Sequence, residues 1–155
     1  MKAIPRPILL FWAFMLFWGS FLAMAAPAVA DGRAEIILGN QAAQRGDLDA
    51  AIAHFSKAIK TPGLSKANLA VAYNNRGSAW DDKDQTGKAL ADYSKAIEID
   101  PNYHEAYFNR SDLLERQGLL KNALADAKKA AELSPGDQNY LERVKDLEDR
   151  LTKRR

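Results

Sequence analysis

The residues whose side chains could form specific interactions most clearly are arginines and aspartates that recur at one spacing. Arg76 precedes Asp92 by the same number of positions as Arg110 precedes Asp126. A guanidinium group and a carboxylate can form two parallel hydrogen bonds, so we expect each arginine to bind its aspartate. The alternative is that an arginine faces a ligand instead.

Asparagines recur together with these arginines. Asn75 directly precedes Arg76, and Asn109 directly precedes Arg110. A side-chain amide both donates and accepts hydrogen bonds, so a row of asparagines can bind the backbone of a peptide of any sequence. The alternative is that both asparagines are merely solvated on a helix surface.

Both sets lie in a segment, 70–103, that is repeated with substitutions at 104–137. A third, looser copy lies upstream at a slightly longer spacing. A period of about 34 residues is typical of solenoids built from helix–turn–helix units. The matching pairs include Tyr73 and Tyr107, Ala89 and Ala123, Ala96 and Ala130, and Pro101 and Pro135.

Hydrophobic periodicity divides every copy into two helices. Apolar residues fall at i, i+1, i+4, i+7 and i+8, which makes one apolar stripe on a helix. Asp47, Ser65 and Asp137 stand where N-caps are expected. The last predicted helix is apolar on one side only, as suits a helix that seals the end of a solenoid. The predicted helices are 34–45, 47–60, 66–83, 86–99, 103–117, 121–133 and 138–151.

This pattern resembles the tetratricopeptide-repeat family over about 120 residues. In the second copy, Tyr73, Gly77 and Trp80 resemble the family's first-helix positions. The third copy departs from the pattern, with Ser111 for the glycine and Ala127 for the second-helix aromatic residue. The residues that resemble the family's second-helix positions are Ala89, Tyr93, Ala96 and Pro101.

The resemblance implies an all-α fold, a right-handed solenoid of three repeats. The repeats are expected at 32–65, 66–103 and 104–137. A capping helix and a basic tail follow at 138–155. The first helix of each repeat is then expected to line a concave face. The residues predicted to contact a peptide on that face are Asn40, Asn74, Asn75, Ser78, Phe108, Asn109 and Asp112.

Two of these predictions have alternatives or limits. Phe108 is either an exposed apolar anchor for the peptide or a half-buried packing residue. Asn75 and Asn109 resemble the asparagine ladder of peptide-holding members of the family, but the first copy has Ile37 at that position.

The carboxylate clamp of co-chaperones with this fold needs lysine and arginine, whereas Ile36, Glu105 and Asn109 stand at the corresponding positions. A C-terminal carboxylate ligand is therefore not expected.

Composition excludes several classes of protein. The chain has no cysteine, which excludes disulfides and thiol chemistry. Outside residues 1–30 it has 20 basic and 20 acidic side chains, a balance that argues against binding to nucleic acid. The stretch 82–87 imitates the start of an EF-hand loop, but Tyr93 stands where the bidentate glutamate is required. No catalytic motif accompanies the two histidines, His54 and His104. We expect no enzymatic activity, no cofactor and no bound metal.

Residues 1–30 have the layout of a secretory signal peptide. Lys2 and Arg6 precede an apolar run, and Ala28-Val29-Ala30 gives a small-residue cleavage pattern before Asp31. The alternative is an uncleaved anchor, because the apolar run is long enough to span a bilayer. Either arrangement places the repeats outside the cytoplasm.

The sequence thus predicts an exported protein–protein interaction module, periplasmic in a bacterial cell envelope, that holds a protein or peptide partner in its concave groove. One alternative is a membrane-anchored subunit of an envelope assembly complex, with membrane contact only if residues 1–30 are retained. Another alternative is a self-associating structural protein, which would form a homo-oligomer.

Overall fold

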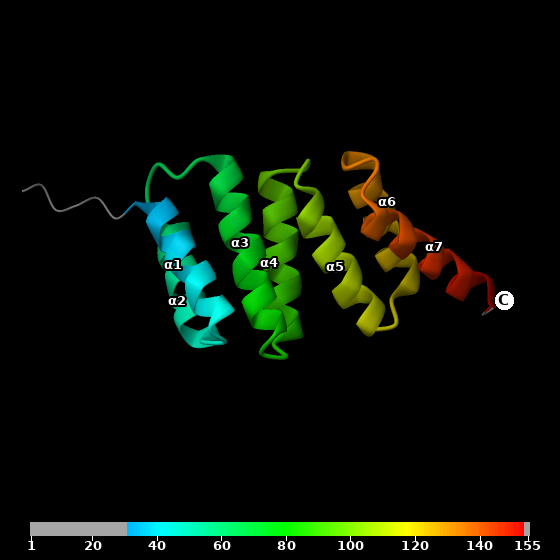
Figure 1. Ribbon diagram of the computed structural model, residues 1–155, viewed down its shortest axis with the longest axis horizontal. Coiled ribbons are helices and arrows are strands. Elements are labelled where there is room, and N and C mark those ends of the chain that lie inside the picture. The colour runs from blue at the N-terminus through cyan, green and yellow to red at the C-terminus, as the bar shows by residue number, and fades with distance from the viewer. Residues whose placement is uncertain (1–30, 154–155) are drawn as a thin grey trace, which may run out of the picture.

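The computed structural model describes residues 31–153. The predicted signal segment, residues 1–30, lies outside the described residues. Three antiparallel pairs of helices are stacked in chain order and followed by one further helix (Figure 1). The helices of the described part are α1 (Gly32–Gln44), α2 (Leu48–Lys60), α3 (Lys66–Asp81), α4 (Thr86–Ile99), α5 (His104–Arg116), α6 (Leu120–Leu133) and α7 (Gln138–Lys153).

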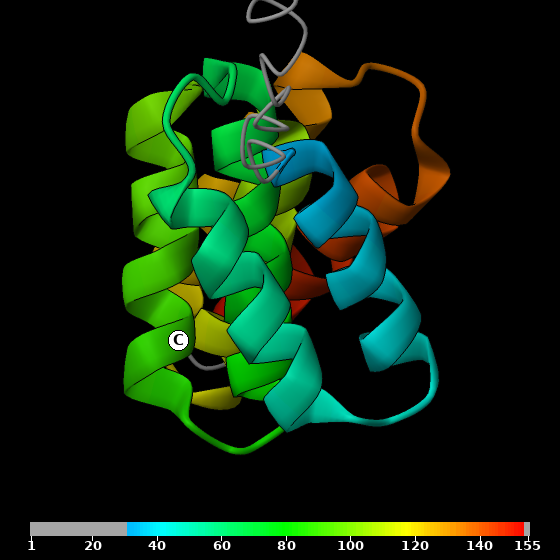
Figure 2. The same ribbon diagram turned by 90° about the vertical axis from the view of Figure 1, so that its left-hand side faces the viewer.

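The predicted all-α solenoid is confirmed, and the ends of each helix lie within two residues of the prediction. Each helix packs mainly against its neighbours along the chain, and α3 also contacts the other first helices, α1 and α5 (Figures 1 and 2). Asp47, Ser65 and Asp137 all accept a hydrogen bond from a backbone N–H two or three residues later, at 3.0–3.2 Å. The three expected caps are therefore present.

A glycine opposite an aromatic ring sets the separation of the two helices in each of the first two repeats. A Cβ atom on Gly39 would lie 2.5 Å from the ring of Phe55, and a Cβ atom on Gly77 would lie 2.9 Å from the ring of Tyr93. Both rings are buried. Only glycine lets the helix backbone approach the ring this closely.

The third repeat solves the same packing problem in another way. Ser111 and Ala127 stand at the positions of the glycine and the ring, and both residues are fully buried. The hydroxyl of Ser111 donates to the carbonyl oxygen of Ala123 at 2.8 Å, so the buried polar group is satisfied. A larger residue on α5 is thus accommodated by a smaller one on α6.

The predicted arginine–aspartate pairs are confirmed as bidentate contacts within a repeat. Arg76 donates to both carboxylate oxygens of Asp92 at 2.7 and 2.8 Å. Arg110 binds Asp126 in the same way at 2.7 and 2.9 Å. Both aspartates are buried. In each pair the hydrogen bond to the carboxylate raises the pKa of the arginine.

Each arginine also reaches back to the preceding repeat. Arg76 donates to the hydroxyl of Ser56 on α2, and Arg110 donates to the hydroxyl of Ser94 on α4, both at 3.1 Å. One guanidinium group therefore joins three helices. We call the sets Ser56–Arg76–Asp92 and Ser94–Arg110–Asp126 the two staples.

The first repeat has a different polar pair. Leu38 stands at the arginine position and His54 at the aspartate position. Instead, His54 contacts the carboxylate of Glu35 at 2.7 Å, which links α1 and α2.

The seventh helix covers the end of the stack, as predicted. Leu147 is fully buried against α6, and Val144 and Leu151 are half-buried in the same cluster. No helix in residues 31–153 is long and apolar enough to cross a membrane.

Candidate peptide-binding groove

One face of the stack is formed by the first helices α1, α3 and α5 together with α7. Side chains from three of these helices surround a hollow of about 340 Å³ on that face, with Tyr93 of α4 contributing to its lining. We call this face the first-helix groove. The residues around the hollow are Ser78, Asp81, Asp82, Tyr93, Asn109, Asp112, Glu115, Arg116 and Arg143.

A chain of side-chain amides runs along the groove and joins three repeats. Asn109 donates to Asn74 at 2.9 Å, Asn74 donates to its neighbour Asn75 at 3.2 Å, and Asn75 donates to Asn40 at 2.9 Å. Asn74 is only 5% exposed, and its amide accepts a hydrogen bond from Asn109 and donates one to Asn75. The role of Asn74 in the groove is therefore to connect these two asparagines.

The half-buried members of this amide chain keep hydrogen-bonding capacity. Asn40, Asn75 and Asn109 are half-buried. Among the described residues, the amide oxygen of Asn109 accepts no hydrogen bond, and the amide nitrogen of Asn40 donates none. Because an amide offers two donor hydrogens and two acceptor sites, these groups can bind a peptide backbone.

The structure brings most of the predicted site residues together. Ser78, Asn109 and Asp112 line the hollow. Phe108 lies beside it and packs against Tyr140 of α7, with ring centroids 4.8 Å apart. Of the two alternatives for Phe108, the half-buried packing position is the one observed. That these residues contact a peptide stays a prediction.

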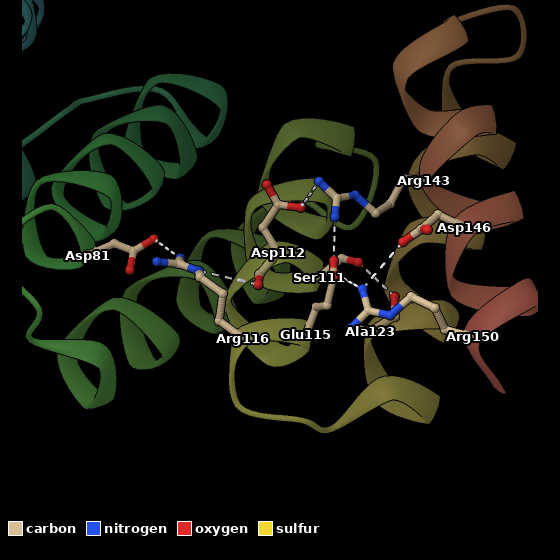
Figure 3. A network of polar contacts seen from close by, with 9 residues as sticks. All are labelled: Asp81, Ser111, Asp112, Glu115, Arg116, Ala123, Arg143, Asp146 and Arg150. Carbon is tan, nitrogen blue, oxygen red and sulfur yellow. Dashed lines mark hydrogen bonds and ion pairs between the residues drawn. The ribbon is translucent and has the colours of Figure 1, made fainter. Parts of the chain in front are cut away.

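An ion-pair network crosses the groove from α3 to α7 (Figure 3). Arg116 of α5 binds Asp81 of α3. Arg143 of α7 binds Asp112 at 2.7 Å and also Glu115, so α7 is tied to α5. Arg150, one further member, binds Glu115 and Asp146.

Sequence reasoning missed the two arginines of α7 as groove residues. Because α7 belongs to no repeat, aligning the repeats could not show which face of α7 carries Arg143 and Arg150. A usable signal was present, because the two residues are seven positions apart and therefore lie on one side of a helix.

The electrostatics of the hollow are dominated by partial burial. Burial raises the pKa of Asp112, and this outweighs the opposing effect of Arg143 and Arg116. Burial also raises the pKa of Tyr93 to about 12, and the hydroxyl of Tyr93 donates to that of Ser78 at 3.3 Å. Both effects describe a groove floor that is shielded from water.

A second hollow, of about 630 Å³, continues the groove along α7. The rings of Phe108 and Tyr140 lie in its wall, and His104 contacts the hydroxyl of Tyr140 at 2.9 Å. The full lining is Phe108, Asp137, Asn139, Tyr140, Glu142, Arg143 and Asp146.

The positions of a carboxylate clamp hold no cationic group. Ile36 is buried, Glu105 lies 3.2 Å from His104, and Asn109 belongs to the amide chain. In residues 31–153 no group of three or more histidine, aspartate or glutamate side chains could hold a metal ion.

Models of the tetratricopeptide repeat match residues 70–103 and 92–125. The first tetratricopeptide domain of Spaghetti (RPAP3), solved with the Hsp90 peptide SRMEEVD, superimposes with a TM-score of 0.71. That superposition covers 80% of this chain and 95% of the domain, at 21% sequence identity. Residues 70–125 therefore consist of tetratricopeptide repeats, and the described residues have the fold of a tetratricopeptide domain.

Two further similarities are to proteins that carry the name UNC-45. The tetratricopeptide-repeat chain is 41% identical over 63 residues to "Protein unc-45 homolog B" of Danio rerio. This match covers 40% of the chain but only 7% of the relative. The myosin chaperone UNC-45 from C. elegans, in complex with a Hsp90 peptide, superimposes with a TM-score of 0.67 at 30% identity. The superposition covers 78% of this chain and 14% of UNC-45.

Proposed function

We propose that the chain is a non-enzymatic protein–protein interaction module that holds a segment of a partner protein in its first-helix groove. The amide chain carries this proposal. Asn40, Asn75 and Asn109 keep donor and acceptor groups, and Asn109 lines the hollow of about 340 Å³. A groove with such groups can bind main-chain N–H and C=O groups of an extended segment.

The similarity to UNC-45 supports a peptide as the class of ligand, since that chaperone was solved with a Hsp90 peptide. The mode of binding proposed here is different. Without cations at Ile36, Glu105 and Asn109, a terminal carboxylate has no counter-charge at the clamp positions. An internal stretch of the partner is therefore the proposed ligand.

The test is a double variant, Asn75→Ala/Asn109→Ala, with a partner recovered by pull-down from envelope extract. We expect affinity to fall about 10- to 100-fold, which corresponds to the loss of one to two hydrogen bonds. Calorimetry measures the affinity, and thermal melts show whether the variant remains folded.

The matched control is Asn122→Ala, which removes an exposed amide from α6, a second helix away from the groove. Its affinity should equal that of the unchanged protein. Unchanged affinity in the groove variant, with the fold intact, would remove the amide chain from the binding site.

We further propose that the module acts outside the cytoplasm, in the periplasm of a bacterium. The support is the layout of residues 1–30, with Ala28-Val29-Ala30 before Asp31. N-terminal sequencing of the protein from its host should find Asp31 as the first residue. A chain that still begins at Met1 would contradict cleavage and favour the anchored alternative.

A further inference from the structure

Negative charge is concentrated along the first-helix groove. The linings of its two hollows contain seven carboxylates but only two guanidinium groups, Arg116 and Arg143. Arg150 adds a third because it binds two of these carboxylates. Outside residues 1–30 the chain is balanced at 20 basic and 20 acidic side chains, so the groove is locally acidic in a neutral protein. The seven carboxylates belong to Asp81, Asp82, Asp112, Glu115, Asp137, Glu142 and Asp146.

The arginines do not neutralise all of this charge. They bind Asp81, Asp112, Glu115 and Asp146. No ion pair within residues 31–153 involves the remaining three carboxylates, and Asp82 and Glu142 among them are solvent-exposed. Asp82 lines the first hollow and Glu142 lines the second.

The wall of the second hollow is partly aromatic. Phe108 and Tyr140 pack together at 4.8 Å in the second hollow, and the guanidinium of Arg143 already lies 5.7 Å from the ring of Phe108. This contact shows that the ring face accommodates a cation. Lysine and arginine combine an aliphatic stem, which packs on an aromatic surface, with a cationic head that reaches carboxylates.

We infer that the partner segment held in the first-helix groove is basic, with lysine or arginine side chains between the aromatic wall and the carboxylates of α3 and α7. This inference rests on the proposed function and adds the chemistry of the partner. An acidic segment is repelled by the same carboxylates, and like charges brought together at an interface oppose binding. The groove thus differs in charge preference from one that accepts the acidic peptide SRMEEVD.

The experiment compares two peptides of equal length, SRMKKVK with an amidated C-terminus and SRMEEVD. Each is titrated into the isotope-labelled chain, purified from its host as processed there, and amide chemical shifts are recorded. We expect SRMKKVK to shift residues 78–82, 108–116 and 137–146, and SRMEEVD to leave them in place. Binding of SRMKKVK should weaken at high salt because added ions screen the carboxylates.

The test variant is Asp82→Asn/Glu142→Gln, which removes two exposed negative charges that take part in no ion pair of the described residues. The control is Glu98→Gln/Glu132→Gln on α4 and α6, where each glutamate, among the described residues, forms an ion pair only with the lysine three residues before it. We expect affinity for SRMKKVK to fall about fivefold in the test variant and less than about twofold in the control.

Two results would overturn the inference. The first is binding of SRMEEVD to the same residues as tightly as SRMKKVK. The second is equal affinity of SRMKKVK for the test and control variants. A salt-sensitive dimer that is lost in the test variant would support the basic chemistry and identify the segment as the tail 153–155 of a second copy.

Failure of this inference is distinguishable from failure of the proposed function. A recovered partner that needs Asn75 and Asn109 but binds through a segment without lysine or arginine leaves the function intact and removes the charge preference. If a partner binds both variants, Asn75→Ala/Asn109→Ala and Asp82→Asn/Glu142→Gln, with the same affinity as the unchanged protein, the proposed function and the charge preference are both contradicted.

Discussion

The first repeat keeps the glycine–aromatic packing of the second repeat but lacks its staple, whereas the third keeps the staple and lacks the packing. In the first repeat Gly39 faces Phe55, while Glu35 and His54 form the polar contact. In the third repeat Arg110 holds its staple, and Ser111 replaces the glycine. Packing and polar contact are therefore separable parts of one repeat.

The staple is absent from the first repeat because its arginine needs binding partners on two other helices. An arginine of a staple needs an aspartate on its own second helix and a serine on the preceding second helix. In the described part of the chain no second helix precedes α1, so Leu38 has no serine to reach. Val144 of α7 stands one repeat length after Arg110 and likewise has no following helix there. Staples occur where both partners exist.

The largest expected effect comes from breaking a staple. Arg110→Leu gives the third repeat a leucine at the arginine position, as the first repeat has in Leu38. It leaves the buried Asp126 without its counter-charge. The free energy of unfolding should fall by about 2–3 kcal/mol. Urea unfolding measures it, and a cycle with Asp126→Ala should show coupling. Additive losses would mean that the two side chains do not stabilise each other.

A smaller effect is expected from the packing. Gly39→Ala brings a Cβ atom to 2.5 Å from the ring of Phe55. Overpacking outweighs the better helix propensity of alanine, so stability should fall by about 1–2 kcal/mol.

Gly87 provides the matched control for this variant. Apart from its chain neighbours and the backbone of its own helix, no atom lies within 4 Å of a Cβ atom there, and Gly87→Ala on α4 should raise stability by about 0.5 kcal/mol. Thermal melts compare the two variants. A neutral or stabilising Gly39→Ala would show that the ring of Phe55 can move aside.

The smallest expected effect concerns the ring of the second repeat. Tyr93→Phe copies Phe55 of the first repeat and removes the 3.3 Å hydrogen bond to Ser78, at a cost of about 1 kcal/mol or less at pH 7. The pKa of Tyr93 is raised from 10.0 to about 12 in the folded state. Its stabilising contribution is therefore complete below pH 10 and is lost as the pH rises to about 12.

Urea unfolding between pH 7 and pH 12 tests this difference. The unchanged protein should lose stability over pH 10–12 more steeply than the variant. Tyr103, whose pKa is also raised to about 12, keeps part of the slope in both proteins. Identical slopes would show that the hydroxyl of Tyr93 ionises as it does in the unfolded chain.

Much of the fold followed from the repeat period, because residues that share a register share an environment. The helices and the arginine–aspartate pairs were predicted in this way. The serines of the staples were not, since Ser56 lies farther from Arg76 along the chain than Ser94 lies from Arg110. The difference is the longer connection between the first two repeats, which hides the equivalence.

The candidate site was predictable in its residues but not in their contacts. The repeat assigned Asn75 and Asn109 to one face, which the structure supports. It could not show that Asn74 bridges Asn109 and Asn75, because this depends on how closely α3 and α5 approach. Nor could it show that α7 covers Phe108 with Tyr140, since α7 has no counterpart among the repeats.

The staples also determine how the stack should respond to tension along its length. Pulling its two ends apart separates neighbouring repeats, and the contacts across those seams include the single hydrogen bonds to Ser56 and Ser94. The bidentate bonds to Asp92 and Asp126 lie within repeats. A single hydrogen bond from a guanidinium group to a neutral hydroxyl is weaker than a bidentate bond from the same group to a carboxylate. Under tension, the interfaces between neighbouring repeats should therefore separate first, while the two helices of each repeat stay packed together.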